Sequence, residues 1–278
     1  MVWILKNTWT PQRLLEVGDS VDTSTGATEV FTGAGRAYIK PMGNRQGPHV
    51  LATDWVGTHL AEWFGLSTFD IAILMLGADD SFRLPQGCYA QQGPAFAAKA
   101  LNGESWGISD IHLDLLVNPE DISRLVVFDT WTLNCDRHDA GQNRRKPNRD
   151  NVYLSSEGVK PGKRRLIAMD HGLCFIRSGE DLSARLGHID KVQDANIYGL
   201  FPEFRDRLQD DVIDKCLCRL QELERETVEV IIRTVPAEWE VSSEARAAWA
   251  RLILDRAKFV ANNFQKWIDS ALGHPRLF

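Results

Sequence analysis

The sequence predicts an α+β fold with two lobes, a small strand-rich lobe over residues 1–100 and a larger, mainly helical lobe over residues 101–278. Short β-type runs separated by glycine and proline dominate the first third of the chain, and apolar residues recur at helical spacing after residue 105. Within the stretch 134–154, a long polar segment also lies between an apolar helix and an apolar strand of the second lobe. Polar groups near a core are costly unless they are paired or bind something, so this segment indicates a functional site.

The composition is that of an ordinary globular protein, with 44% hydrophobic and 25% charged residues in a chain of 278. The net charge of -6 argues against non-specific binding to nucleic acid. The five cysteines are scattered without CxxC spacing, which argues against a disulfide framework or a zinc site and for a reducing compartment. No apolar run is long enough for a membrane span or typical of a signal peptide, so we expect a cytoplasmic protein.

The first lobe is expected to contain four strands and one helix. The strands are predicted at residues 28–31, 36–39, 69–76 and 87–100. Between the second and third of them, residues 49–64 place Leu51, Trp55 and Trp63 on one face of a helix, and Gly65 can end it in the left-handed conformation.

The second lobe begins its main helix at Asn118-Pro119. Asn118 can cap the helix, Pro119 suits its first position, and the two acids that follow favour its first turn. The remaining elements are short strands at residues 151–154 and 166–169, and helical segments at 196–204, at 211–234 and after Ser242 or Ser243.

The polar segment and the strands around it contain the side chains that phosphoryl transfer requires. Asn151 and Asp170 offer oxygen ligands of the kind that Mg²⁺ prefers. Asp136 is left to orient or deprotonate a hydroxyl. Lys40, at the end of a predicted strand, can supply a cation for phosphate groups, and Asp54 on the next helix can hold it by an ion pair.

Four motifs around these residues resemble known enzymes. They are IKPMGNRQGPHVLATDWVGTHLAEWFGL (39–66), FDTWTLNCDRH (128–138), DNVYL (150–154) and AMDHGLCF (168–175). In them the chain resembles the HipA-like kinases and, more distantly, the phosphatidylinositol 3/4-kinase branch of the protein-kinase-like fold, over residues 28–205. The resemblance implies a two-lobed protein-kinase-like fold that binds ATP and Mg²⁺ between a small β-rich N-lobe and a larger helical C-lobe.

The same resemblance implies a role for each of these candidate residues. Asp136 matches the catalytic-loop aspartate, Asn151 and Asp170 the metal ligands, and Lys40 the lysine that binds nucleotide phosphates. Asp54 stands where the family usually has glutamate, and its shorter side chain reaches Lys40 only if its helix lies closer.

Two parts of the family pattern are altered. Gly33 and Gly35 are a short remnant of a phosphate-binding glycine loop. The segment before Asn151 is longer than usual, so Asn143 and Asn148 are rival metal ligands; Asn151 is preferred because it directly precedes the apolar VYL.

Other polar residues of the segment have structural alternatives. Arg137 is expected to brace the loop through its carboxylates. His138 and His171 lack a third ligand at the spacing of a zinc site. A further set is either a solvated surface or a cationic lip beside the active site: Arg144, Arg145, Lys146, Arg149, Lys160, Lys163, Arg164 and Arg165.

The expected function is therefore an ATP-dependent kinase that phosphorylates a hydroxyl. The resemblance implies a protein serine or threonine as acceptor, a toxin-like role and an antitoxin-like partner. A small molecule or lipid head group is the alternative acceptor. Two other functions stay open from the residues alone, a pseudokinase that acts by binding nucleotide and a partner, and a metal-dependent hydrolase.

Overall fold

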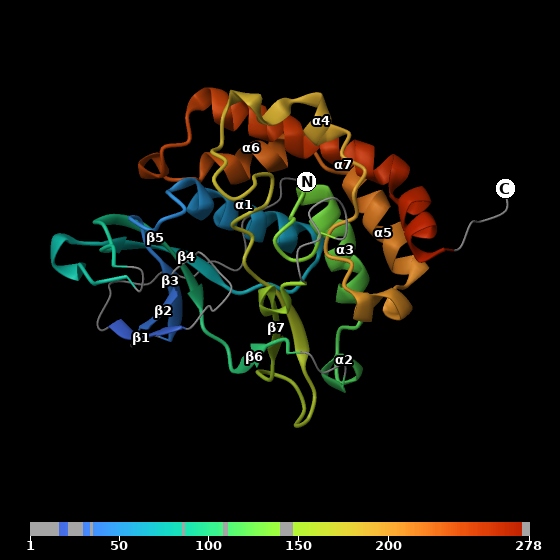
Figure 1. Ribbon diagram of the computed structural model, residues 1–278, viewed down its shortest axis with the longest axis horizontal. Helices are drawn as coiled ribbons and strands as arrows, with labels where there is room; N and C mark the ends of the chain where they lie inside the picture. Colours follow the sequence, from blue (N-terminus) through green and yellow to red (C-terminus); the bar gives the residue numbers. More distant parts are fainter. Residues whose placement is uncertain are drawn as a thin grey trace.

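The structure is a computed structural model that describes residues 17–21, 30–33, 36–84, 87–107, 111–139 and 147–273. Two antiparallel sheets lie beside a larger helical part, and helix α1 (His49–Phe64) lies between the first sheet and the C-terminal helices (Figure 1). With its small sheets and larger helical part, the chain has the α+β class expected from its sequence.

The first sheet contains five strands in the order β1-β2-β3-β5-β4. Their bounds are β1 (Val17–Val21), β2 (Val30–Gly33), β3 (Ala37–Lys40), β4 (Ile71–Leu76) and β5 (Gly93–Lys99). In β3 the last residue, Lys40, pairs in register with Phe96 of β5. The sequence predicted four of these strands, and β1 was missed.

Helix α1 has the bounds predicted for it, and Gly65 follows it in the left-handed conformation with φ 95°. Nearly all of its side chains are buried, because it contacts β5 on one side and α3, α5 and α6 on others. A helix that is apolar on most of its circumference is typical of such a central position.

The second sheet has the order β6-β7-β8, with β6 (Gly103–Ser105), β7 (Val152–Ser155) and β8 (Arg165–Ala168). Val152 pairs with Ala168, and Ser155 pairs with Arg165 at the other end of the hairpin. Because the strands are antiparallel, the start of β7 and the end of β8 lie together. This register brings Asn151 and Asp170 to one end of the β7–β8 hairpin, whereas the turn with Lys160 and Lys163 lies at the other end.

Six helices form the rest of the α-helical structure in the described residues. Besides α1 they are α2 (Ile111–Asp114), α3 (Glu120–Thr132), α4 (Ile189–Val192), α5 (Asp210–Gln221), α6 (Arg225–Arg233) and α7 (Ser243–Leu272). Short 3₁₀ turns are η1 (Ala78–Asp80), η2 (Arg149–Asn151), η3 (Ala184–Gly187), η4 (Pro202–Arg207) and η5 (Ala237–Trp239).

Three expectations about these helices need correction. Residues 196–201 are not helical, since a helical turn begins only at Pro202. The segment 211–234 is two helices with a break between Gln221 and Arg225. Asn118 does not cap α3, because its amide exchanges hydrogen bonds of 2.9 Å with the backbone N–H and C=O of Leu166 and thereby ties α3 to β8.

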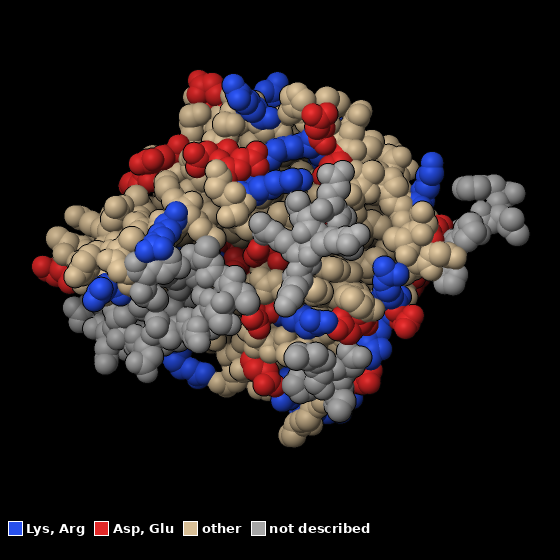
Figure 2. Space-filling view, viewed as in Figure 1, with Lys and Arg blue, Asp and Glu red and all other residues tan. Residues whose placement is uncertain are grey.

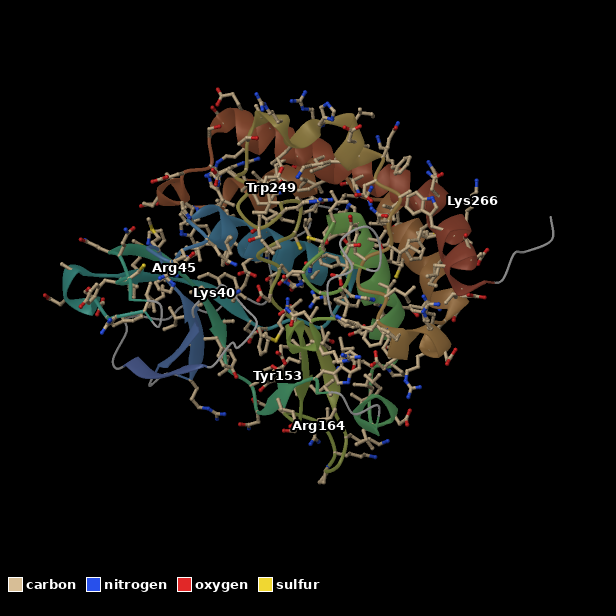
Figure 3. The ribbon with its side chains drawn as sticks, in the orientation of Figure 1. Lys40, Arg45, Tyr153, Arg164, Trp249 and Lys266 are labelled. Atoms are coloured by element: carbon tan, nitrogen blue, oxygen red, sulfur yellow. The ribbon has the colours of Figure 1, made fainter. Side chains whose placement is uncertain are left out.

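One large apolar core joins α1 to the helices around it. Trp131 of α3 and Trp249 of α7 are both fully buried in it, and the indole of Trp131 donates to the Ile253 carbonyl at 3.0 Å. Figure 3 labels Trp249 among the C-terminal helices, Lys40 at the end of a strand of the first sheet, and Lys266 farther along α7. Within the described residues, none of the helices combines the length and apolar character needed to cross a membrane.

Candidate active site

Lys40 binds two of the predicted site residues, Asp54 and Asp170. Its ammonium nitrogen is 2.6 Å from Oδ2 of Asp54 and 3.0 Å from Oδ1 of Asp170, and the side chain is buried. Burial opposes the charge, but the carboxylates of Asp170 and Asp54 outweigh it and hold the pKa of Lys40 above its ordinary value. The ion pair that depended on a close helix is thus formed in this fold.

Asp54 joins two elements through its two oxygens. While Oδ2 binds Lys40 of β3, Oδ1 accepts a hydrogen bond of 2.7 Å from the backbone N–H of His171. Burial raises the pKa of the Asp54 carboxyl although the Lys40 ammonium opposes this shift. Asp54 therefore fixes β3 relative to the segment that contains Asp170.

Asp170 follows β8 in an unusual backbone conformation. Its φ of 55° is in the left-handed region, which non-glycine residues adopt at an energetic cost and which occurs often at functional sites. Burial disfavours its charge, but Lys40 and then Arg137 lower its pKa below the ordinary value. The carboxylate is thus held ionised, with 24% of the side chain exposed.

Asp136 and Asn151 face each other across the polar segment. Between residues 131 and 139 every side chain but that of Asp136 is buried. The Asn151 amide nitrogen donates to Oδ2 of Asp136 at 2.9 Å, which turns the Asn151 amide oxygen away from Asp136. An amide oxygen from Asn151 and a carboxylate from Asp170 are a donor set that fits Mg²⁺, which keeps several water or phosphate ligands.

Arg137 bonds the backbone next to both of these candidate ligands. Its guanidinium is fully buried, bonds Oδ2 of Asp129 at 2.7 Å through Nε, and donates from Nη1 to the carbonyls of Asn151 and, at 2.9 Å, of Met169. Arg137 thus braces one carboxylate and two carbonyls, whereas the sequence predicted carboxylates alone. Because the two carbonyls belong to Asn151 and to the residue before Asp170, one side chain sets their separation.

Asp129 was missed by sequence reasoning. It is fully buried in α3, and burial raises its pKa to about 6 although Arg137 opposes the shift. A second oxygen accepts from the Asn134 amide at 3.2 Å, which helps to turn the chain after α3. The signal in the sequence was an aspartate between Phe128 and Thr130, in the middle of an apolar helix.

The two histidines near the motifs have packing partners. His138 stacks on Phe201 with 5.6 Å between ring centroids, and His171 meets the edge of Phe128 at 5.5 Å. Burial lowers the pKa of both imidazoles. In the part of the chain that the structure describes, no three His, Cys, Asp or Glu side chains are grouped as a metal site would require.

The other predicted site residues are placed as follows. Gly33 ends β2, whereas Gly35 and Asn143 lie outside the described residues. Asn148 precedes η2 and donates its backbone N–H to the Arg137 carbonyl at 2.8 Å. Arg149 bonds Glu203 and lies over the Trp106 ring at 5.5 Å, so its charge is paired.

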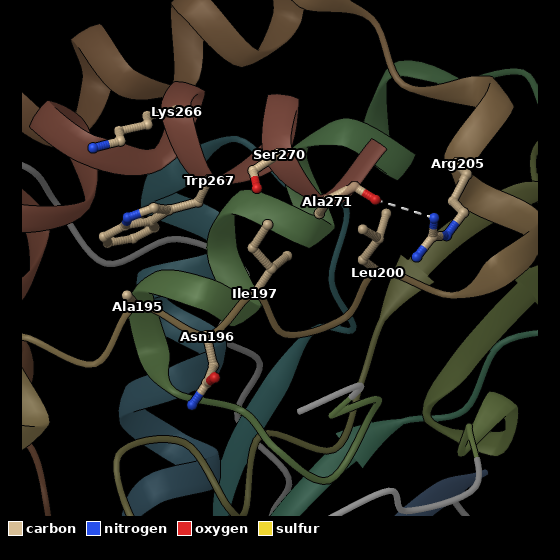
Figure 4. A pocket seen from close by; sticks show the side chains of 9 residues that line it. All are labelled: Ala195, Asn196, Ile197, Leu200, Arg205, Lys266, Trp267, Ser270 and Ala271. Atoms are coloured by element: carbon tan, nitrogen blue, oxygen red, sulfur yellow. Dashed lines mark hydrogen bonds between the residues drawn. The ribbon is translucent and has the colours of Figure 1, made fainter. Parts of the chain in front are cut away.

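The pocket drawn in Figure 4 is lined by none of the candidate site residues. That pocket has a volume of about 410 Å³ and lies between the segment 195–205 and the last turns of α7, with Trp267 on one wall. Arg205 on its rim donates to the Ala271 carbonyl at 3.2 Å. Figure 2 instead shows acidic side chains near the centre of the molecular face, close to where Figure 3 places Lys40.

Comparisons with known proteins identify the family and the fold of the chain. A family model described as HipA-like kinase matches residues 22–267. The solved structure of CtkA, a proinflammatory kinase of Helicobacter pylori, is 12% identical, covers 93% of this chain and 97% of its own, and has a TM-score of 0.51. HipA of Shewanella oneidensis MR-1, solved with HipB and its operator DNA, is 11% identical over 98% of this chain and 70% of its own, with a TM-score of 0.47. Among proteins of curated function, none matches.

Proposed function

The chain belongs to the HipA-like kinase family, and from this premise we propose that it transfers the γ-phosphoryl group of ATP to the hydroxyl of a protein serine or threonine. Two pairs carry the proposal, Lys40 with Asp170 and Asn151 with Asp136. Arg137 links them, because its guanidinium donates to the carbonyls of Asn151 and of Met169, the residue before Asp170. Phosphoryl transfer depends mainly on positioning and charge stabilisation, and these side chains can supply both.

Each side chain has a role in this proposal. Asn151 and Asp170 would hold Mg²⁺, which when bound neutralises phosphate charge. Lys40 binds the nucleotide phosphates and is kept in place by Asp54. Asp136 orients the acceptor hydroxyl and accepts its proton, and the hydrogen bond from Asn151 holds its carboxylate toward the metal ligands.

The contact between Lys40 and Asp54 supports transfer over nucleotide binding alone. In active protein kinases the lysine that binds the phosphates must form an ion pair with an acid of the neighbouring helix, and Asp54 of α1 supplies that acid here. Hydrolysis is the outcome if water replaces the acceptor. A toxin-like role and an antitoxin-like partner rest on family membership and are tested separately from transfer.

The test compares wild type with Asp136→Ala. We expect the substitution to lower the rate of phosphoryl transfer roughly 10²–10⁴-fold, because the acceptor loses its base, while the affinity for ATP stays the same. Transfer of ³²P from labelled ATP to a protein acceptor and to water, with binding measured by calorimetry, gives both quantities.

Asp211→Ala is the matched control, since Asp211 is an exposed aspartate on α5. Equal transfer by wild type and Asp136→Ala would contradict the assignment of Asp136. Phosphate release without any labelled acceptor would replace the kinase by a hydrolase.

A further inference from the structure

Helix α1 approaches the segment 170–174 unusually closely. A Cβ atom added at Gly57 would lie 2.5 Å from Cβ of His171, 3.2 Å from its Cγ and 3.4 Å from Sγ of Cys174. Carbon atoms need at least 3.4 Å for an ordinary contact. Any side chain at position 57 would therefore push α1 outward by about 1 Å.

Gly172, in the segment 170–174, allows the same close approach to α1. A Cβ atom there would lie 2.8 Å from Cγ1 of Val50 and 3.4 Å from Oδ2 of Asp54. The Thr53 hydroxyl donates to the Gly172 carbonyl at 2.5 Å, which draws the same face of α1 onto the segment. The two glycines thus let a helix and a loop meet backbone to backbone.

Asp54 is three residues before Gly57 and lies on the same face of α1. Its carboxylate reaches Lys40 at 2.6 Å and the His171 N–H at 2.7 Å at the same time. If α1 moved outward by about 1 Å, the short aspartate side chain could not keep both contacts.

We infer that Gly57 is a positioning residue of the kinase site, and that Gly57 and Asp54 form a matched pair in which the missing side chain at 57 compensates for the short acid at 54. The inference rests on the proposed function for its effect on transfer, but its geometric part does not. It explains why aspartate suffices where the family resemblance leads one to expect glutamate.

Two single substitutions test the pair. Gly57→Ala should move α1 outward and lower kcat/KM for ATP about tenfold or more, since a displacement of about 1 Å at a catalytic group is costly. Asp54→Glu should lower it similarly, because the added methylene, about 1.3 Å long, has no room in the close interface. Alanine favours a helix more than glycine does, so loss of helical propensity cannot explain the effect of Gly57→Ala.

The double variant Asp54→Glu/Gly57→Ala gives the decisive comparison. The outward shift caused by Gly57→Ala is about as long as the extra reach that Asp54→Glu adds to the acid, so the double variant should have a higher kcat/KM for ATP than either single variant. A merely steric defect at position 57 would not be rescued by a longer acid. Losses that multiply in the double variant, or wild-type kinetics of Gly57→Ala, overturn the inference.

A second readout does not require turnover. The midpoint of thermal unfolding should fall in both single variants and recover in the double variant, and a midpoint lower than in both singles contradicts the inference. Should wild type transfer no phosphate, the proposed function fails while this readout still decides the matched pair. A Gly57→Ala chain that does not fold should fold again with Asp54→Glu, and a double variant that also fails to fold counts against the pair.

Gly187→Ala is the control for a glycine-to-alanine change. Gly187 lies in η3, and the nearest atom to an added Cβ is the Ala248 carbonyl oxygen at 3.9 Å. This variant should keep wild-type kinetics and thermal midpoint.

Discussion

At the residue scale, the site depends on buried carboxylates that share a small number of cations. Asp54 and Asp170 share Lys40, and Asp129 holds Arg137, all within the interior or close to it. The attraction within a buried pair offsets the loss of hydration only while both partners are present. Removing one partner should therefore be more harmful than removing both.

Arg137→Met makes this prediction quantitative. Arg137 and Asp129 are both fully buried, so the substitution leaves a carboxylate without its cation and should lower the free energy of unfolding by about 3–5 kcal/mol. Adding Asp129→Asn removes that charge and should restore part of the stability. Urea unfolding of the two variants measures the difference.

Activity should behave differently from stability in the same pair of variants. The carbonyls of Asn151 and Met169 lose their donor in both, so the separation of Asn151 and Asp170 is no longer set and transfer should stay low. Lys215→Met, in an exposed pair with Asp211, should change neither quantity. A double variant with full activity would show that Arg137 is structural only.

At the element scale, short turns rather than long helices hold the candidate ligands. Asn151 is the last residue of η2, and the turn is fastened by Arg149, which bonds Glu203 of η4 and covers the Trp106 ring. The backbone N–H of Asn148 adds a bond to Arg137. The position of Asn151 thus depends on side chains that do not touch it.

Arg149→Met should therefore weaken the affinity for Mg²⁺ without abolishing transfer. Loss of a supporting residue around a metal ligand typically costs 10–100-fold in metal affinity, so we expect the Mg²⁺ concentration at half-maximal activity to rise about tenfold. Titration of transfer with Mg²⁺ at saturating ATP measures it. Lys163→Met is the control. Lys163 lies in the turn at the other end of the β7–β8 hairpin, so this variant should leave the Mg²⁺ concentration at half-maximal activity unchanged. Equal shifts in both variants would indicate a general charge effect.

The sequence predicted elements well where a pattern was local. Helix α1 and the start of α7, where the Ser242 hydroxyl accepts from the Ala245 N–H at 3.1 Å, followed from spacing and capping residues. The short strand β6 was missed, since three exposed residues form a strand only by pairing with β7. The use of Asn118 to bind β8 was missed for the same reason, because its partner lies 48 residues away.

The residue types of the candidate site could be read from the sequence, but their spacing could not. The residue types of Lys40, Asp136 and Asp170 indicated phosphoryl transfer before their positions were known. Whether Asp54 could reach Lys40 depended on how closely α1 packs, and that distance is set by Gly57 against His171. A tertiary contact of this kind leaves no periodic signal in the sequence.

At the scale of the whole molecule, α1 connects the first sheet to the helical part. Its Trp55 indole donates to the Thr234 hydroxyl at 2.8 Å, and Arg219 of α5 donates to the Trp63 carbonyl at 3.1 Å. Trp239 reaches the sheet directly, with its indole 2.9 Å from the Pro94 carbonyl. The helix with Asp54 is bonded to the helical part through Trp55 and Trp63 and packs against β5 of the first sheet, in keeping with its central position in Figure 1.

Nucleotide should add a further connection between these parts. Lys40 belongs to the first sheet, whereas Asn151 and Asp170 flank the second, so Mg²⁺ and ATP bound by all three would bind the folded chain only. A ligand at 100 times its dissociation constant stabilises a protein by about 2.7 kcal/mol, which for a chain of this size raises the unfolding midpoint by about 4–5 °C.

We expect this shift with Mg²⁺ and ATP together and a smaller one with ATP and a chelator. In Asp170→Ala the part that depends on Mg²⁺ should disappear, because one of the two candidate ligands is lost, while Asp211→Ala should keep it. Differential scanning calorimetry of the three proteins, without ligand and under both ligand conditions, measures these shifts. A shift in Asp170→Ala that still depends fully on Mg²⁺ would place the metal elsewhere.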